Sequence, residues 1–159
     1  MPERYHHDFA SFWPYYVSQH MRRGTRALHY VGTWIALLAL AAAVADALTG
    51  FLGLGAARWL LVPAGIATTY LFAWVSHWAL EKNQPASFVY PAFSFRGDLV
   101  LFWRITTGRI GGDTALVAQR LAEGWAVDKY GFYPPDYARE HGIVTDTRLV
   151  SYAAASDGA

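Results

Sequence analysis

Long apolar runs alternate with short polar, aromatic-rich segments along this chain. Two runs, residues 27–45 and 59–80, contain no Asp, Glu, Lys or Arg. A helix that crosses a bilayer needs about 20 mostly apolar residues, and both runs meet that requirement. They predict two antiparallel transmembrane helices, over about residues 27–48 and 59–80, joined by the nearly uncharged link DALTGFLGLGAAR. The alternative, a buried helical hairpin in a soluble protein, is less favoured because uncharged runs of this length are rare outside membranes.

Basic residues flank the two runs on the sides away from the link. Arg22, Arg23 and Arg26 precede the first run, and Lys82 and Arg96 follow the second. Cytoplasmic flanks of transmembrane helices are enriched in Lys and Arg. We therefore expect an integral membrane protein with both termini in the cytoplasm and the glycine-rich link on the opposite side.

Shorter amphipathic segments border the runs. In SFWPYYVSQHMRRG, three aromatic residues and His20 share one helical face, which predicts an interfacial helix with its aromatic side toward lipid or the spans. Ser11 is a suitable N-cap, Pro14 fits the first turn, and Gly24 is expected to end the helix. The segment DLVLFWRITTGR repeats the pattern after the second run, with Asp98 as its predicted cap.

The remaining residues predict a small soluble part. Asp113 is expected to cap a short helix, TALVAQRLAEG, and the following YGFYPPDYAREHGI is loop-rich. We expect the final SYAAASDGA to be disordered. The fold class predicted is thus all-α, with a membrane domain over residues 1–111 and a soluble C-terminal helix and tail over residues 112–159.

Composition narrows the functional classes. Hydrophobic residues make up 54% of the chain and charged residues 16%, against about 25% charged in soluble domains. The net charge of +1 gives no polyanion signal, so we expect no nucleic-acid partner. There is no Cys, which excludes disulfides, thiolate zinc sites and iron–sulfur clusters. Any metal must bind His, Asp, Glu or backbone oxygen, and no feature of the sequence indicates an oligomeric state.

Three of the six histidines are predicted to converge. His29 lies near the start of the first run and His77 near the end of the second, so antiparallel helices bring both to one depth. His20 precedes His29 by nine residues, about 900° of an unbroken helix, and would lie on the opposite face without a bend at Gly24. Ionisable side chains at membrane depth are candidates for function. Three imidazoles at one level predict a metal site with nitrogen and oxygen ligands.

Simpler interpretations remain open for single residues. One histidine at the end of a membrane span is more often an interfacial hydrogen-bonding group than a ligand. Glu81, one helical turn after His77, could orient that ring, bind the metal directly, or be a solvated helix-end charge. His6 and His7 fit a solvated pair, and His141 lies in a tail with no partner motif.

Two stretches, QHMRRGTRALHYVGT and SHWALEKNQPASFVYP, together resemble a small family of membrane proteins long described as a domain of unknown function. The family pattern is a His, eight residues and a second His followed closely by Gly, and later a His, three residues, Glu-Lys and Pro-Ala. The matching residues in this chain are His20, His29, Gly32, His77, Glu81, Lys82, Pro85 and Ala86. The resemblance covers about residues 12–110. Between the first two histidines the family usually has Asn-Pro-x-Asn, where this chain has RRGT.

The resemblance implies an enzymatic function. The characterised member of that family is an Fe(II)-dependent dioxygenase of phytosphingosine breakdown, which shortens 2-hydroxy fatty acids by one carbon using O2. It implies Fe(II) as cofactor, a fatty acid and O2 as substrates, and fatty acid alpha-oxidation at the cytoplasmic membrane interface. His20, His29 and His77 are then the expected metal ligands.

Glu81, Lys82 and Arg26 are expected to assist catalysis. Arg26 or Lys82, or else Arg96, could neutralise the substrate carboxylate, although basic residues here also set the topology. Glu81 is the expected partner of His77. The competing hypothesis is a non-enzymatic membrane protein whose His/Glu cluster is structural and which binds lipid or a protein partner.

Overall fold

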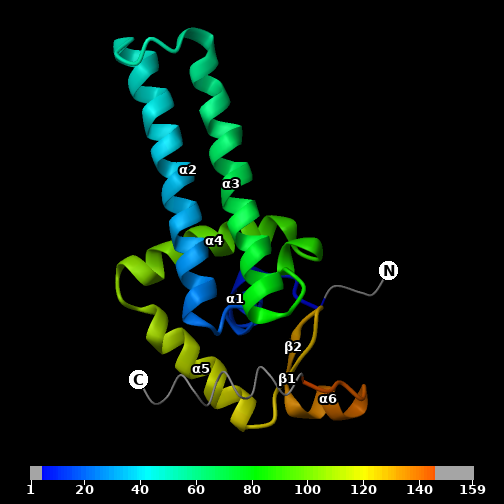
Figure 1. The fold of residues 1–159 in the computed structure, drawn as a ribbon. Coiled ribbons are helices and arrows are strands. Elements are labelled where there is room, and N and C mark those ends of the chain that lie inside the picture. The colour runs from blue at the N-terminus through cyan, green and yellow to red at the C-terminus, as the bar shows by residue number, and fades with distance from the viewer. Residues whose placement is uncertain (1–4, 146–159) are drawn as a thin grey trace.

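Two long helices form a hairpin that stands on a base of shorter elements (Figure 1). The computed structural model describes residues 5–145, so the predicted disorder of SYAAASDGA lies outside the described residues. The hairpin consists of α2 (Arg23–Thr49), a short 3-10 helix η1 (Gly55–Leu60) and α3 (Leu61–Ser76). The base contains α1 (Phe9–Ser18), η2 (His77–Glu81, a π-helical turn), η3 (Ala86–Phe88), α4 (Pro91–Thr106), α5 (Ile110–Ala122), β1 (Ala126–Val127), β2 (Phe132–Tyr133) and α6 (Pro135–Glu140).

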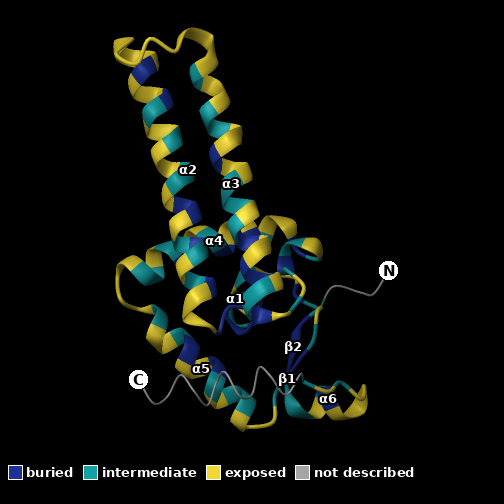
Figure 2. Ribbon diagram, in the orientation of Figure 1, coloured by how far each residue is buried: buried dark blue, intermediate teal, exposed yellow. Residues whose placement is uncertain are grey.

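Both arms of the hairpin are long and apolar enough to cross a membrane. The candidate spans are Arg23–Thr49 and Gly55–Glu81; each begins four residues earlier and ends one residue later than predicted. Only 22% and 17% of their most apolar windows are buried, and Figure 2 shows exposed residues along the outer faces of both helices. A core helix of a soluble protein would be mostly buried. The low burial favours lipid as the surroundings of the hairpin, while passage through a bilayer in opposite directions stays a prediction.

Small residues allow α2 and α3 to pack closely. A Cβ atom built on Gly65 would lie 3.0 Å from the Cα atom of Ala36, and one on Gly32 would lie 3.1 Å from the Cα atom of Thr69. The hydroxyl of Thr69 donates a hydrogen bond to the carbonyl of Gly32 at 2.7 Å. Gly32 and Ala36, like Gly65 and Thr69, are four residues apart, the small-xxx-small spacing of closely packed membrane helices.

We expect Gly65→Leu to loosen this hairpin. Overpacked cores typically lose about 1–3 kcal/mol, and a leucine side chain here has no room against Ala36 and Ala39. Thermal unfolding of the detergent-solubilised protein measures the loss. The matched control is Gly112→Leu on α5, where a Cβ meets nothing within 4 Å. Equal transition temperatures for both variants and the parent would refute the close-packing argument.

A buried ion pair closes the far end of the hairpin. Asp46 is fully buried, and its Oδ2 atom lies 3.3 Å from Nε of Arg58. Oδ1 of Asp46 accepts the backbone N–H of Leu52 at 2.8 Å, and Arg58 also donates to the Asp46 carbonyl at 2.7 Å. These bonds satisfy the end of α2 and fix the turn at the tip, well away from the histidines.

Helix α1 lies in the centre of the base. Its Phe12, Tyr15 and Tyr16 side chains are buried in an aromatic core shared with α4 and α5. The predicted cap at Ser11 is wrong: Asp8 is the N-cap and accepts the Ser11 N–H at 2.8 Å. The helix therefore begins one turn earlier than expected, and Pro14 lies in its interior. The aromatic face packs against protein, and an interfacial position of α1 stays a prediction.

Helices α4 and α5 also begin earlier than the acidic residues expected to cap them. Pro91 is the first residue of α4, a position where its missing N–H costs nothing. Asp98 therefore lies mid-helix and is not a cap. Asp113 lies in the first turn of α5, where its Oδ1 accepts from the indole of Trp13 at 3.1 Å and lies 3.2 Å from Nη2 of Arg104.

The C-terminal part contains a small sheet that the all-α prediction missed. Strands β1 and β2 are antiparallel, with Ala126 opposite Tyr133. The turn forms because Oδ1 of Asp128 accepts the N–H groups of Tyr130 and Gly131, at 2.7 and 2.9 Å.

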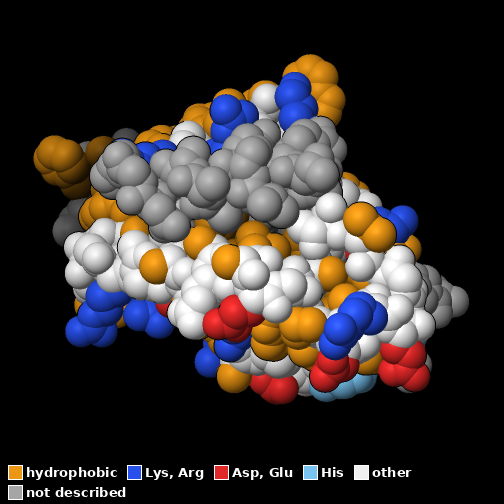
Figure 3. Space-filling view, turned by 90° about the horizontal axis from the view of Figure 1, so that it is seen from below, with side chains coloured by type: hydrophobic (Ala, Val, Ile, Leu, Met, Phe, Trp, Pro, Cys, Tyr) orange, Lys and Arg blue, Asp and Glu red, His pale blue; other side chains and the backbone are white. Residues whose placement is uncertain are grey.

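The base viewed from below carries charged side chains of both signs (Figure 3).

Residues after the predicted domain boundary at residue 111 form hydrogen bonds with residues before it. The hydroxyl of Tyr15 donates to the Lys129 carbonyl and that of Tyr90 to the Tyr130 carbonyl, both at 2.7 Å. The division at residue 111 stays a prediction.

Candidate metal centre

Three histidines meet where the hairpin joins the base. His20 follows α1, His29 lies in the second turn of α2, and His77 begins η2. All three are buried, and each offers a ring nitrogen within 4.8 Å of the others. Their ring centroids are 4.5, 4.6 and 5.4 Å apart. The expected convergence is present, and the group could hold a metal ion.

The chain bends between α1 and α2 to bring His20 opposite His29. The expected bend at Gly24 is wrong, because α1 ends at Ser18 and α2 begins at Arg23, so that Gly24 lies inside α2. The absent Cβ of Gly24 serves another contact: a Cβ there would be 3.0 Å from the Leu80 side chain. The four residues 19–22 carry the bend, and His20 lies within them.

Hydrogen bonds fix the tautomers of His20 and His29. Nδ1 of His20 lies 2.6 Å from the carbonyl oxygen of Tyr16, and Nδ1 of His29 lies 2.7 Å from Oδ1 of Asp98. Both partners accept hydrogen bonds at these distances, so each Nδ1 carries a proton, and in the neutral ring Nε2 then holds the lone pair. Nε2 is thus the nitrogen of both rings that is free to bind a metal.

The ring of His77 is fixed in the same way by Asn83. Its Nδ1 lies 2.7 Å from Oδ1 of Asn83. The amide nitrogen of Asn83 donates to the side chain and the carbonyl of Gln19, at 2.8 and 3.3 Å. These bonds orient the amide so that its oxygen faces the ring. Nδ1 of His77 therefore donates, and its Nε2 is also a potential ligand.

The chemistry of this cluster fits a metal ion. Within residues 5–145, Nε2 of His20 and Nε2 of His29 are buried and have no hydrogen-bond partner. An unsatisfied buried polar atom costs about 1–3 kcal/mol, and a metal ion bound by both nitrogens would remove that cost. Burial lowers the pKa of His20 well below its usual value. The ring is therefore neutral, the form that binds metals.

Asp98 is a functional candidate that the sequence interpretation missed. Its Oδ1 accepts from Nδ1 of His29 and, at 2.5 Å, from the hydroxyl of Tyr16. The Tyr16 ring packs against Gly97, where a Cβ would lie 2.8 Å from its Cε2 atom. A carboxylate that holds the far nitrogen of a liganding histidine orients the ring and raises its basicity.

A signal for Asp98 was present in the sequence. Ser94, Asp98 and Leu101 recur at the helical spacing of one face, and Pro91 marks the earlier helix start. Recognising that start would have placed Asp98 on an inward face rather than at a cap.

Two of the three residues expected to assist catalysis, Glu81 and Arg26, bond to the backbone around His20 rather than to the histidine rings. Oε1 of Glu81 accepts the backbone N–H of Arg22 at 2.8 Å, so its partner is not His77 as expected. Arg26 donates to the carbonyl of His20 at 2.9 Å and to that of Met21 at 2.6 Å. Both side chains hold the backbone segments that carry the histidines.

Lys82 and Arg96 point elsewhere. Lys82 has a left-handed backbone, with φ of 58°, and its ammonium lies 5.6 Å from the ring of Trp78. The guanidinium of Arg96 lies over Phe9 at 4.2 Å. Neither these two residues nor Arg26 and Glu81 line the pocket beside the histidines.

That pocket is small and partly polar. Its free volume is about 20 Å³, room for about one water-sized species. Besides the three histidines, the polar residues that line it are Tyr16, Tyr70, Ser87, Ser94 and Asp98. The hydroxyl oxygen of Ser94 is buried and has no hydrogen-bond partner within the described part of the chain.

The other histidines lie outside the cluster. His6 is buried rather than solvated, because β2 folds over the N-terminal segment: the Phe132 N–H donates to Nε2 of His6 at 3.3 Å. Burial lowers the pKa of His6 to about 4. His7 is exposed as expected, and the exposed His141 ring stacks on Tyr137.

Fold and centre together define a mostly helical protein with two helices that could cross a membrane and a buried three-histidine group that could hold a metal ion. The family model for 2-hydroxy-palmitic acid dioxygenase Mpo1-like proteins matches residues 6–110, and the chain belongs to this Mpo1-like family. The resemblance drawn from the two histidine-containing stretches is thereby confirmed. No curated protein and no solved structure matches the chain.

Proposed function

We propose that this protein is an Fe(II)-dependent dioxygenase that shortens 2-hydroxy fatty acids by one carbon at the membrane surface. The observation that supports it most is the set of three buried histidines with oxygen acceptors on every Nδ1, in a chain of a family described as 2-hydroxy-palmitic acid dioxygenases. His20, His29 and His77 would hold the ion through Nε2. When bound, Fe(II) would supply open positions for O2 and for the hydroxyl and carboxylate of the substrate.

The protein residues position and desolvate the reacting groups. Asp98 and Asn83 hold the ring protons of His29 and His77, which keeps their Nε2 lone pairs directed into the pocket. No Lys or Arg is among the residues that line the pocket, whereas the hydroxyl groups of Ser87 and Ser94 are. We propose that the Ser94 hydroxyl donates to the substrate carboxylate, because it is buried without a partner in residues 5–145.

We propose a cytoplasmic membrane interface as the location of the centre. Large aromatic side chains are exposed around the junction of hairpin and base, where the histidines lie; they are Trp74, Trp78, Phe88, Phe95 and Trp103. Aromatic residues gather at the headgroup level of membranes. A fatty acid could then keep its tail in lipid while its polar head reaches the centre.

The topology can be tested with single cysteines, since the chain has none of its own. We expect Phe51→Cys, at the exposed tip of the hairpin, to react with a membrane-impermeant thiol reagent added outside intact cells. Glu140→Cys, exposed on the base, should react only after the membrane is opened. Equal labelling of both from outside would contradict a cytoplasmic base, and the cysteine-free parent gives the background.

The function itself is tested with detergent-purified protein. Metal analysis should find about one iron per chain after anaerobic loading with Fe(II). Addition of O2 and 2-hydroxypalmitic acid should then yield a product one carbon shorter, with no turnover of palmitic acid. Protein that binds no metal and turns over no 2-hydroxy acid would support the structural His/Glu cluster instead.

We propose that Glu81 is a positioning residue that ties the end of the second span to the start of the first. Glu81→Gln should keep the metal and lose activity only modestly, because the amide oxygen can still accept the Arg22 N–H. Glu81→Ala should lower both thermal stability and metal content. Loss of the metal in Glu81→Gln would instead identify Glu81 as a direct ligand. Unchanged metal content, activity and stability in both variants would show that Glu81 has no role in the site.

A further inference from the structure

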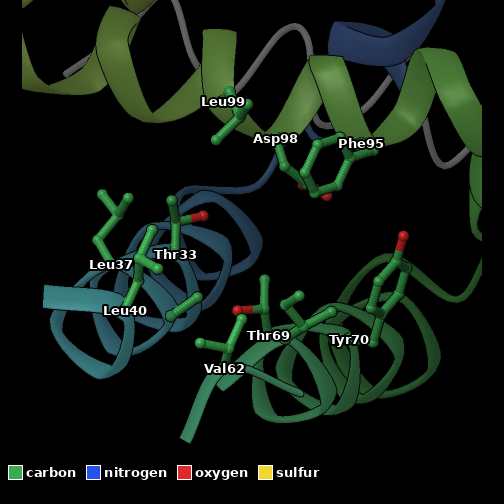
Figure 4. A pocket seen from close by; sticks show the side chains of 11 residues that line it. Thr33, Leu37, Leu40, Val62, Thr69, Tyr70, Phe95, Asp98 and Leu99 are labelled. Atoms are coloured by element: carbon green, nitrogen blue, oxygen red, sulfur yellow. The ribbon is translucent and has the colours of Figure 1, made fainter. Parts of the chain in front are cut away.

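A second, larger cavity adjoins the centre on the membrane side. It lies between α2, α3 and α4 (Figure 4) and has a free volume of about 160 Å³, similar to an engineered apolar cavity that binds benzene. Its walls are mainly aliphatic and aromatic, with Leu37, Leu40, Val62, Ile66, Phe95 and Leu99 as the main apolar contributors. Several of these side chains are partly exposed, so the cavity is a groove that opens toward lipid.

The groove lies next to the centre. Tyr70 and Asp98 line both cavities. From His29 the α2 wall runs through Thr33 to Leu40, eleven residues or about 16 Å at 1.5 Å per residue. A molecule with one end at the histidines could therefore extend along the groove toward the middle of the hairpin.

The groove has few polar side chains, and two of them, Thr69 and Asp98, are engaged in hydrogen bonds. The hydroxyl of Thr69 donates to the Gly32 carbonyl at 2.7 Å, and Oδ1 of Asp98 accepts from Tyr16 and His29. A polar ligand would lose its hydration there with little compensation. An alkyl chain has no polar groups that would lose hydrogen bonds to water, and each buried methylene tightens binding by about fourfold.

We propose that this groove binds the acyl chain of the substrate, while its hydroxyl and carboxylate stay at the histidine centre. The chain would pass Tyr70 and Asp98, which line both cavities, and run toward Leu40 and Val62. This inference rests on the proposed function for the identity of the substrate. The wall at Leu37 and Leu40 would distinguish long 2-hydroxy acids from short ones, because a chain of only a few carbons would not reach it.

Photolabelling of the full-length protein in lipid nanodiscs tests the groove without turnover. The probe is 2-hydroxypalmitic acid with a diazirine midway along its chain, and mass spectrometry maps the labelled peptides. We expect label on the groove wall around Leu37 and Ile66, competed by 2-hydroxypalmitic acid and not by lactate. Label spread evenly over the lipid-facing surface of the hairpin would overturn the proposal.

Two neighbouring substitutions provide the matched comparison. Leu37→Trp should fill the groove and reduce specific labelling at least tenfold, whereas Leu38→Trp adds the same bulk at a residue that is 60% exposed and does not line the groove. Transition temperatures of both variants check that they fold. Parental labelling in a folded Leu37→Trp protein would also overturn the proposal.

The same variants separate this inference from the proposed function. In an active enzyme, Leu37→Trp should lower kcat/KM for 2-hydroxypalmitic acid by at least tenfold, mainly through KM, and leave 2-hydroxyhexanoic acid nearly unaffected. Turnover without groove labelling would reject the groove and keep the dioxygenase. Groove labelling without turnover or iron would keep the groove as a fatty-acid site and reject the dioxygenase.

Discussion

His29→Ala is expected to lose nearly all bound iron and all turnover, and so are His20→Ala and His77→Ala. Each variant removes one of three nitrogens that meet within 4.8 Å. Loss of a group that merely orients a ligand typically costs about 10–100-fold in metal affinity, so loss of a ligand itself should cost more. Metal content per chain, measured after loading with Fe(II) and removal of free ion, checks the result.

The control variants for this experiment come from the exposed histidines. His7→Ala and His141→Ala should keep parental metal content, since neither ring belongs to the cluster. His6 is a poor control, because it is buried and its loss should lower stability. A His77→Ala protein that folds and binds parental amounts of iron would remove His77 from the ligand set.

The convergence of the three histidines could be predicted from the sequence because it depends on simple regularities. Two uncharged runs of about 20 residues imply two spans, and antiparallel spans bring the start of one beside the end of the other. His29 and His77 occupy those two ends. The bend that adds His20 lies at residues 19–22 and not at Gly24, since that glycine lies inside α2 and allows close contact with Leu80.

The hydrogen-bond partners of the histidines could not be predicted in the same way. In an α-helix Glu81 would lie beside His77, but residues 77–81 form a π-helical turn, which changes that relation. The backbone N–H of Asn83 bonds to the His77 carbonyl at 3.3 Å, and the Asn83 side chain takes the place expected for Glu81. Such π-helical turns are frequent at functional sites, but no residue pattern in this stretch predicts one.

Contacts between segments that are distant in the sequence explain why His6 and Asp98 differ from their predicted roles. His6 was expected in solvent, but the rings of Tyr15 and Tyr90 pack against it, and Phe132 on β2, 126 residues later in the chain, donates to its Nε2. The interpretation of Asp98 as a cap followed from local propensity, which favours Asp at helix starts. Helix α4 begins earlier, and its crossing beneath α2 gives that carboxylate a tertiary role instead.

Asp98→Asn is expected to lower metal affinity by about 10–100-fold, the usual cost of altering the partner of a liganding histidine. The amide oxygen can still accept from His29 and Tyr16, but bonds to a charged acceptor are roughly twice as strong as neutral ones. Asp98→Ala should do worse, since it leaves both donors buried without an acceptor. Tyr16→Phe should do least harm, because the bond from His29 to Asp98 remains.

Competition with a chelator of known affinity gives the metal affinity of each variant, and thermal unfolding of the metal-free protein gives its stability. Asp113→Asn is the matched control: Asp113 is also a mostly buried helix carboxylate with an aromatic donor, Trp13, but it lies outside the histidine cluster. It should lose stability and keep parental metal affinity. If Asp98→Ala behaves like this control, with lower stability and unchanged metal affinity, Asp98 only packs α4 against the hairpin. If affinity falls in the order Tyr16→Phe, Asp98→Asn, Asp98→Ala, the carboxylate orients His29 for the metal.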